Sequence, residues 1–239
     1  IPTTHQTWHI IAEDLRPGSN QNGTATPAHT TLEANAVVVT VPAPQAIALL
    51  EPLAGQTISA DVLEQLHAVE FYPCIAVMAG YSTDSWQDWQ THFPDVRAIV
   101  PHHSDVGWIG LDSSKRNSSN QTVFVVQSTP DFAQTHLETS DLQPIGNHLL
   151  KAAANQLRDW IAQPEWMQVH RWRYALPSQP LPNKVLDAET PAPLLCAGDW
   201  CGGMRVESAF LSGMEAAETL NRQMQARIMP NAHFWDAIA

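Results

Sequence analysis

The chain has 239 residues, of which 44% are hydrophobic, enough to bury a substantial core in one large domain or two small ones. Lys and Arg number 12 against 24 Asp and Glu, so the formal net charge of -12 excludes a basic surface for nucleic acid or an anionic membrane. The three cysteines fit no disulfide or zinc framework, and no signal peptide or membrane-spanning run is visible, so we expect a cytoplasmic protein.

The first half of the chain predicts strands that alternate with short helices. TWHIIAEDL (7–15) has a strand-like pattern and leads into a loop rich in Gly, Asn, Thr and Pro (17–30). AVVVTV (36–41) is a continuous β-branched run, which is typical of a strand buried on both faces. Pro42 ends that strand. Further predicted elements are short helices at 45–53 and 61–68, strands at 74–81, 106–112 and 122–129, the last two forming a hairpin, and an unassigned segment at 82–95.

The second half begins with one amphipathic helix and ends with another. Apolar residues recur at helical spacing from Leu149 to Ile161. VHRWRYAL (169–176) alternates like a strand, and a proline-rich connector (177–193) leads to a short strand, PLLCAG (193–198). A long helix is predicted from about residue 205 to about residue 228, with an apolar face formed by Val206, Phe210, Met214, Ala217, Leu220 and Met224. Together these elements predict a mixed α/β fold.

The segment GDWCGG (198–203) joins the last predicted strand to the last predicted helix. Asp199 falls at the carboxyl end of the strand, where open α/β sheets bind ligands, and its carboxylate suits the hydroxyls of a sugar or ribityl chain. Gly198 and Gly203 let a ligand approach the backbone, and the unpaired N–H groups of a helix start favour an electron-rich atom. The alternative interpretation is a plain turn followed by a flexible linker, and the local pattern supports both equally.

Four segments resemble the FAD-dependent amine oxidase superfamily. LLCAGDWCGGMRVESAFLSGMEAAETL (194–220) resembles the C-terminal flavin-binding signature of that superfamily, and within it the renalase-like branch. AVVVTVPAPQAIALL (36–50), WIGLDSSKRN (108–117) and VHRWRYALP (169–177) resemble segments of the same branch in the same order. The similarity thus extends over most of the chain.

This resemblance implies the C-terminal part of a two-domain FAD-binding oxidoreductase fold with a mixed-sheet substrate domain. It assigns residues 1–54 to part of the FAD-binding domain, 55–176 to a substrate-binding domain, and 177–239 to the C-terminal part of the FAD-binding domain. Asp199 would accept hydrogen bonds from hydroxyls of the cofactor, and the backbone around Arg205 would address the flavin C2 carbonyl. The cofactor-binding residues that the resemblance implies are Pro42, Gly198, Asp199, Gly203, Arg205, Val206 and Ala209.

The chain departs from the family pattern at its start. A renalase-like enzyme opens with a strand, a GxGxxG turn and a helix that hold the pyrophosphate, and no three of the eleven glycines here have that spacing. The first residue is also not methionine. We therefore expect an N-terminal dinucleotide-binding segment to be missing from this chain, or to be supplied by a separate one.

For the intact enzyme, the resemblance implies hydride transfer from a reduced small molecule to the flavin, followed by reoxidation by O₂. The donors would be dihydronicotinamides, and hence NAD(P)H-derived, in the renalase-like branch, or amines in the wider superfamily; no catalytic residue is assigned. Candidate substrate-lining residues are Trp108, His170, Trp172 and Tyr174, and core packing is the alternative for each. Another alternative is a cofactor-free binding or scaffold protein that retains the substrate-domain fold.

Four other sequence features were considered as possible metal, nucleophile, thiol or phosphate sites. His102 and His103 lie in HHSD (102–105), but neighbouring residues on a strand point to opposite faces, so we expect no metal site. Ser212 sits within a predicted helix and not on a nucleophile elbow. Cys201, beside the start of the last helix, could have a depressed thiol pKa. The pair Arg171 and Arg173 fits either a phosphate-bearing substrate or a solvated strand edge.

Overall fold

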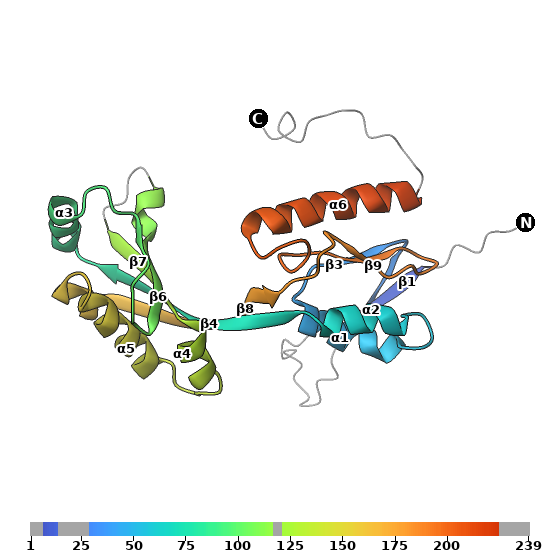
Figure 1. The fold of residues 1–239 in the computed structure, drawn as a ribbon, viewed down its shortest axis with the longest axis horizontal. Helices are drawn as coiled ribbons and strands as arrows, with labels where there is room; N and C mark the ends of the chain where they lie inside the picture. The colour runs from blue at the N-terminus through green and yellow to red at the C-terminus, as the bar shows by residue number, and fades with distance from the viewer. Residues whose placement is uncertain (1–6, 14–28, 117–120, 225–239) are drawn as a thin grey trace, which may run out of the picture. The chain divides into compact units, whose positions relative to one another are not determined.

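The computed structural model describes residues 7–13, 29–116 and 121–224 (Figure 1). The chain forms two compact units: unit 1 comprises Ile1–Glu70 and Gln179–Ala239, and unit 2 comprises Phe71–Ser178. The sequence placed the corresponding boundaries at 54/55 and 176/177, so residues 55–70 fall in unit 1 instead of with the predicted substrate domain. The function assigned to each part stays a prediction.

Unit 1 contains a β-hairpin and a small mixed sheet. Strand β1 (Trp8–Glu13) pairs antiparallel with β2 (His29–Ala34). The sheet has the order β3-β10-β9, in which β10 (Leu194–Cys196) runs parallel to β3 (Val37–Val39) and antiparallel to β9 (Leu186–Asp187). The sequence predicted β1, β3 and β10 but neither β2 nor β9, because these two lack a clear apolar alternation and form through their pairing partners.

Three helices complete the described part of unit 1, and local chemistry sets where the first two begin. Helix α1 (Ala43–Leu50) has a proline in its first turn, and a 3₁₀ turn, η1 (Glu51–Leu53), continues it. Helix α2 (Ala60–His67) is capped by Ser59, whose hydroxyl accepts a hydrogen bond from the Val62 N–H. The third helix, α6 (Val206–Met224), follows the glycine loop.

The strand predicted to be buried on both faces is an edge strand. Val39 is buried, but Val38 is 39% exposed. In the described part of the chain β3 pairs with β10 alone, so one of its edges has no neighbouring strand. The expectation failed because a run of β-branched residues indicates a strand but not its place in the sheet.

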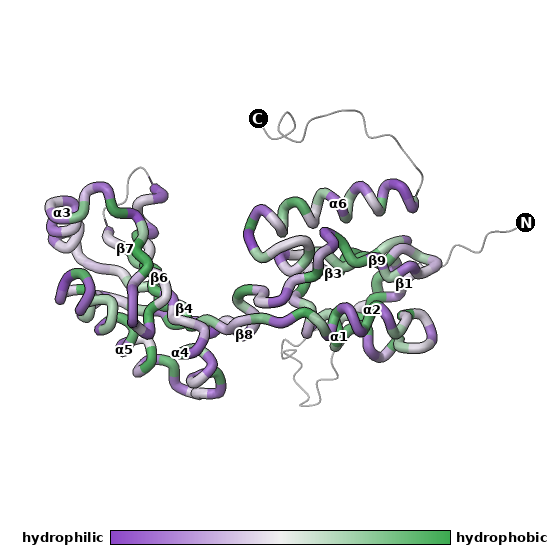
Figure 2. The backbone as a smooth tube through the Cα atoms, viewed as in Figure 1, coloured by the Kyte–Doolittle hydropathy of each residue, from purple (hydrophilic) through white to green (hydrophobic). Residues whose placement is uncertain are grey.

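Helix α6 packs on the sheet with the opposite face from the one predicted. Ser212, Ala216 and Thr219 are buried, and Ala216 contacts Leu195 and Ala197 at the end of β10. Of the six predicted apolar-face residues, Leu220 packs against the same cluster, and the other five are exposed: Val206, Phe210, Met214, Ala217 and Met224. Figure 2 shows hydrophobic and hydrophilic residues alternating along the helix. Small residues allow close approach to the strand, so the apolar stripe is left on the outside in the described structure.

Unit 2 is built on a five-stranded sheet with the order β5-β6-β7-β4-β8. The β4–β7, β6–β7 and β5–β6 pairs are antiparallel, which confirms the predicted hairpin between β6 and β7. Its strands are β4 (Glu70–Tyr81), β5 (Ala98–Ile99), β6 (Val106–Leu111), β7 (Thr122–Ser128) and β8 (Trp166–Gln179). Its helices are α3 (Thr83–His92), α4 (Pro130–Thr135) and α5 (Gln143–Ala154), and its 3₁₀ turns are η2 (Asp112–Lys115) and η3 (Asp159–Ala162).

Alternation along the strands gives this sheet a covered face and an open face. On the covered face, side chains such as Ile75, Val77, Ile109 and Val126 form one hydrophobic core with α3, α5 and η3. We call the other side of the sheet the open face; its residues include Cys74, Ala76 and Met78 of β4, Trp108 and Gly110 of β6, and Gln127 of β7.

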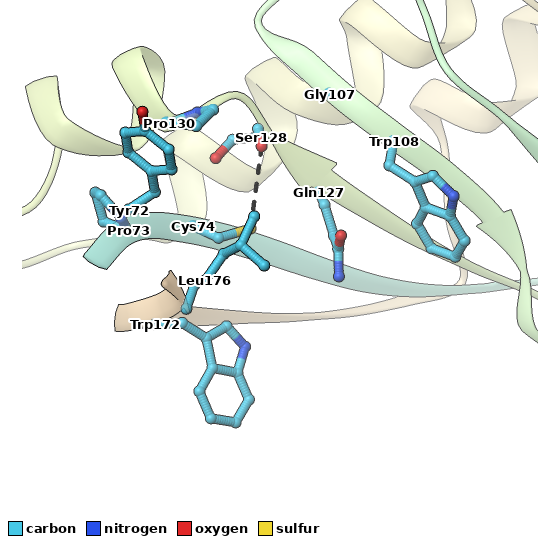
Figure 3. A pocket seen from close by; sticks show the side chains of 11 residues that line it. Tyr72, Pro73, Cys74, Gly107, Trp108, Gln127, Ser128, Pro130, Trp172 and Leu176 are labelled. Carbon is cyan, nitrogen blue, oxygen red and sulfur yellow. Dashed lines mark hydrogen bonds between the residues drawn. The ribbon is translucent and has the colours of Figure 1, made fainter. Parts of the chain in front are cut away.

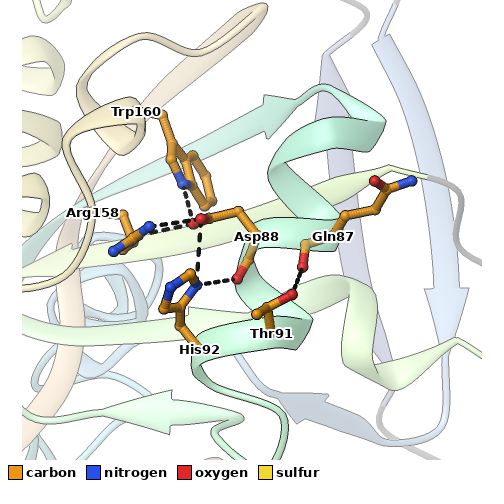
Figure 4. Close-up of polar contacts among 6 residues, drawn as sticks. All are labelled: Gln87, Asp88, Thr91, His92, Arg158 and Trp160. Carbon is orange, nitrogen blue, oxygen red and sulfur yellow. Dashed lines mark hydrogen bonds and ion pairs between the residues drawn. The ribbon is translucent and has the colours of Figure 1, made fainter.

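A partly exposed ion pair joins α3 to the segment after α5 at the edge of the covered face (Figure 4). Arg158 donates two hydrogen bonds to the Asp88 carboxylate, at 2.8 and 2.6 Å, and the Trp160 indole N–H donates a third at 2.8 Å. These bonds lower the pKa of Asp88 to about 2. The segment at 82–95, which the sequence left unassigned, contains helix α3. The helix predicted to continue through Ile161 ends at Ala154 instead, and the residues after it, Arg158 and Trp160, contact Asp88.

Candidate functional site

The two parallel strands of unit 1 bring Pro42 and Asp199 to the same edge of the sheet. Cys196 pairs with Val39, so each residue lies three positions beyond a paired residue. The buried Trp200 fixes the loop between them, because its indole N–H donates to the Val41 carbonyl at 3.2 Å. The N–H of Ala197 also donates to the Val39 carbonyl at 3.0 Å. This edge is the carboxyl end of parallel strands, as the sequence predicted for Asp199.

The loop after Asp199 requires glycine at two positions. Gly202 has φ +74° and Gly203 has φ +151°, both in the region that favours glycine. A Cβ on Gly203 would collide with the Ser208 hydroxyl in the first turn of α6. The chain therefore folds closely over the helix start, where the first N–H groups have no acceptor within the helix.

Asp199 itself is half-buried, and burial raises the pKa of its carboxyl above the usual value. The segment from Asp199 to the start of α6 thus carries a carboxylate, bare glycine backbone and the first N–H groups of a helix, which are acceptors and donors within a few residues of one another. That donor set fits a ligand with hydroxyl groups and an electron-rich ring. Val206 and Arg205 are exposed at this end, and the Ala209 N–H closes the first turn on the Arg205 carbonyl at 3.1 Å.

Cys201 of this loop and Ser212 of α6 are both buried. Cys201 is buried, and burial raises the pKa of its thiol to about 12, so the depressed pKa considered from the sequence is wrong. The buried Ser212 hydroxyl accepts a hydrogen bond from the Gly198 N–H at 3.0 Å. Ser212 of α6 thus holds the glycine loop in place, a contact that residue types and spacing alone do not predict.

The open face of unit 2 carries a cavity of about 640 Å³, shown in Figure 3 and called here the open-face pocket. Trp108 and Trp172 line it, as two of the four candidate substrate-lining residues. The His170 ring packs against Trp172 with centroids 4.3 Å apart, and Tyr174 packs against Phe71 at 5.7 Å. The remaining lining residues were not singled out from the sequence: Tyr72, Pro73, Cys74, Gly107, Gln127, Ser128, Pro130, Ala175 and Leu176.

The arginine pair of β8 is engaged with the chain itself. Arg173 donates to the Glu138 carboxylate at 2.7 Å, and Arg171 donates to the Thr139 carbonyl at 2.7 Å. The bond from Arg173 lowers the pKa of Glu138. The structure therefore favours the strand-edge interpretation of these two arginines over a phosphate site.

His102 and His103 lie in a loop before β6, where His103 has φ +52°. Within residues 7–13, 29–116 and 121–224, no three His, Cys, Asp or Glu side chains come together as a metal site would require. In the same residues no helix is both long and apolar enough to cross a membrane.

Residues 11–221 match the family of flavin-containing amine oxidoreductases. The chain belongs to this family. The match extends into both units and includes the Asp199 loop, most of α6 and the residues of the open-face pocket. It therefore confirms, at the level of the family, the resemblance seen in the sequence, and the family is flavin-containing.

Solved structures of low identity share the fold of this family member. A candidate protoporphyrinogen oxidase from Exiguobacterium sp. 255-15 matches 91% of the chain with 15% identity and a TM-score of 0.54. A putrescine oxidase bound to putrescine matches 80% with 14% identity and a TM-score of 0.56. The cyclohexylamine oxidase from Brevibacterium oxydans IH-35A matches 82% with 13% identity and a TM-score of 0.56.

These neighbours confirm the predicted mixed α/β fold class. They are all much longer than this family member, which spans 47%, 44% and 44% of their chains, respectively. The Asp199 loop with α6, in unit 1, and the open-face pocket, in unit 2, contain most of the candidate residues that the sequence singled out.

Proposed function

We propose that this chain is part of an FAD-dependent oxidoreductase of the renalase-like type. In this proposal a reduced small molecule, a dihydronicotinamide or an amine, gives a hydride to the flavin, which then passes its electrons to O₂. The observation that carries the proposal is the unit formed by β10, Asp199, the Gly202-Gly203 turn and the start of α6. A structural linker would need neither a half-buried carboxylate nor two glycines folded over a helix start.

The residues of unit 1 would bind and orient the cofactor. The Asp199 carboxylate would accept hydrogen bonds from cofactor hydroxyls, and Gly198 and Gly203 would let the cofactor approach the backbone. The N–H groups at Arg205 and Val206 would hold an electron-rich carbonyl, with Ala209 and Pro42 beside them. When bound, FAD supplies the hydride-accepting chemistry.

Unit 2 would hold the substrate. The open-face pocket has the size of a small-molecule site and a mostly apolar lining, with Trp108 and Trp172 among its walls. No lining residue is assigned as a catalytic group in this proposal, because hydride transfer to a flavin needs chiefly orientation and the exclusion of water.

We further propose that a separate N-terminal dinucleotide-binding segment completes the enzyme. Two observations support this proposal. The chain spans less than half of the solved structures that it resembles, and Val206 and Met214 leave an apolar stripe of α6 exposed in the described part of unit 1. Such a stripe is what a missing element of the same domain would cover.

The first experiment measures the visible absorption of the purified chain after incubation with excess FAD and desalting. Retained flavin bands support the proposal, and Asp199→Ala is then expected to release the cofactor, whereas Glu218→Gln, an exposed change on α6, is not. A colourless chain that binds FAD only after fusion to a dinucleotide-binding segment supports the two-part enzyme.

The alternative that the sequence left open is a cofactor-free binding or scaffold protein that retains the substrate-domain fold, for which the open-face pocket of unit 2 would be the binding site. A chain that stays colourless with FAD in both forms of the experiment would support that alternative and contradict the flavoenzyme.

A further inference from the structure

We propose that Ser212 of α6 is a positioning residue for Asp199, which holds the carboxylate where a cofactor would meet it. This inference rests on the proposed function, because it adds to the Asp199 loop a residue that the family resemblance did not assign to the cofactor. Three observations on the described residues support it: the burial of the Ser212 hydroxyl, its two partners in the loop, and the separate anchor of the chain after Asp199.

Ser212 lies on the face of α6 that packs on the sheet, together with Ala216 and Thr219. The residue is 0% exposed. Removing a hydroxyl from water is unfavourable unless the hydroxyl forms hydrogen bonds, and an alanine at this position would avoid that cost. The packing of the helix therefore does not explain a serine here, and the partners of its hydroxyl do.

The Ser212 hydroxyl bonds to residues on both sides of Asp199. It accepts a hydrogen bond from the Gly198 N–H at 3.0 Å, and it bonds to the Cys201 thiol, which partly offsets the effect of burial on the pKa of that thiol. A hydroxyl has one donor and two acceptor positions, which is enough for both bonds. The Cys201 thiol also contacts the Cys196 carbonyl oxygen, at the end of β10, at 3.9 Å. One side chain of α6 thus ties both ends of the loop to the helix.

The chain after Asp199 has a second anchor that does not involve α6. Trp200 is buried, and its carbonyl accepts a hydrogen bond from the Leu181 N–H at 2.8 Å. The chain before Asp199 is held at Gly198, whose N–H bonds to Ser212. Loss of the Ser212 hydroxyl would therefore release the side of Asp199 that leads out of β10, and the carboxylate could turn toward water.

The first test titrates the Asp199 carboxyl by NMR in the purified chain without flavin. Burial raises the pKa of this carboxyl in the parent chain, and Cys201 is the titratable group beside it. Ser212→Ala is expected to move the pKa of Asp199 back toward its ordinary value and to speed hydrogen exchange of the Gly198 amide. Ser212→Thr keeps the hydroxyl and should retain the pKa of the parent. An unchanged pKa in a folded Ser212→Ala would overturn the inference, because a role confined to packing would lower stability and leave Asp199 as it was.

The matched control is Thr219→Val, on the same buried face of α6. The Thr219 hydroxyl accepts a hydrogen bond at 2.8 Å from Arg222 of the helix itself. Its loss should leave the pKa of Asp199 unchanged, and a shift as large as that in Ser212→Ala would count against the inference. If Ser212→Ala does not fold, Cys201→Ala removes the partner at the other end of the loop. It should shift the pKa of Asp199 in the same direction, and no shift would overturn the inference.

Cofactor affinity is the second readout. In whichever form retains flavin, the chain alone or the chain fused to a dinucleotide-binding segment, Ser212→Ala should weaken FAD binding about tenfold and Thr219→Val should not. Equal affinities of the parent and Ser212→Ala would overturn the inference. A chain that binds FAD in neither form contradicts the proposed function instead, and the titration of Asp199 then decides by itself whether Ser212 positions it.

Discussion

The indole ring of Trp108 lies so close to Gly110, two residues further along β6, that a Cβ on the glycine would collide with it. A second contact of the same kind holds Trp166 over Gly80 of β4. Glycine thus gives the open face room for a large ring to lie along the sheet. The position of Trp108, and with it one wall of the open-face pocket, depends on the missing side chain at residue 110.

Gly110→Ala is therefore expected to displace the Trp108 ring and to destabilise unit 2. Overpacking of this kind lowers the free energy of unfolding by about 1–3 kcal/mol. Near-UV circular dichroism would measure the displacement of the ring, and chemical denaturation would measure the free energy of unfolding. Gly213→Ala, where a Cβ meets nothing within 4 Å, is the control: it should leave the Trp108 signal unchanged and, as a Gly-to-Ala change inside α6, should not lower the free energy of unfolding. An unchanged indole signal in Gly110→Ala would show that Trp108 is held in some other way.

Asp88 makes the stability of unit 2 sensitive to acid. Its pKa falls from 3.8 to about 2 in the folded chain, so the carboxylate is favoured by folding. The stabilisation is complete above the unfolded pKa and is lost as the pH falls from 3.8 to about 2. Urea unfolding should give a lower midpoint for Asp88→Asn at pH 7, with a smaller difference near pH 2.

The matched control for Asp88→Asn is Asp95→Asn, because Asp95 is an exposed residue on the loop after α3. Asp95→Asn should leave the midpoint nearly unaltered at both pH values. If it shifts the midpoint as much as Asp88→Asn does, the bonds from Arg158 and Trp160 are not the source of the effect.

In the chain without cofactor, the ionised Asp199 carboxylate is expected to lower the free energy of unfolding. Burial raises the pKa of its carboxyl, so the folded chain binds this proton more tightly than the unfolded chain. Stability therefore rises as the pH falls through the folded pKa, and the ionised carboxylate is unfavourable at pH 7. Thermal unfolding at pH 7 should show Asp199→Asn to be more stable than the parent.

The same substitution should weaken FAD binding by about 10- to 100-fold, the loss expected for hydrogen bonds to a charged group. Flavin fluorescence titration of the chain, fused to a dinucleotide-binding segment if required, would measure it. A variant that is both less stable and equally tight for FAD would contradict both parts of the prediction.

The three cysteines should differ in reactivity. Cys196 and Cys201 are buried, and burial raises the pKa of each thiol to about 12. Cys74 is half-buried. Titration with a thiol reagent should therefore find one reactive group in the native chain and three after denaturation, with Cys74→Ser removing the native one. Rapid labelling of two or three thiols in the native chain would contradict the buried environment of the glycine loop.

On α6 a polar residue should matter more to stability than an apolar one. The buried Ser212 hydroxyl accepts the Gly198 N–H, and Ser212→Ala leaves that donor without a partner, at a cost of about 1–3 kcal/mol. Val206 is 89% exposed, so Val206→Ser should stay within about 0.5 kcal/mol. Chemical denaturation compares the two, and the reverse order would mean that α6 packs by its apolar stripe.

Much of the element order was predictable because it depends on local chemistry. Strands β1, β3, β6, β7 and β10 carry apolar or β-branched runs, and α2 and α6 have helical spacing. Gly202, Gly203 and Asp199 also identified the loop as a candidate site. The backbone freedom of glycine depends on residue type, and the position of Asp199 follows directly from the end of the predicted strand. Cys74 and Gln127 could have been found as well, because period two within 74–81 and 122–129 places them on one side of their strands.

The sequence by itself determined the local features of the chain: which segments form strands, which turn needs glycine, and which strand ends in a carboxylate. Only the tertiary structure decided which faces are buried. It placed small residues of α6 on the sheet and left Val206 outside, ended α5 so that Arg158 could reach Asp88, and gathered Trp108, Gln127, Cys74 and Trp172 from four strands. Periodicity reports that a face is apolar, whereas burial depends on the distant segments that pack against it.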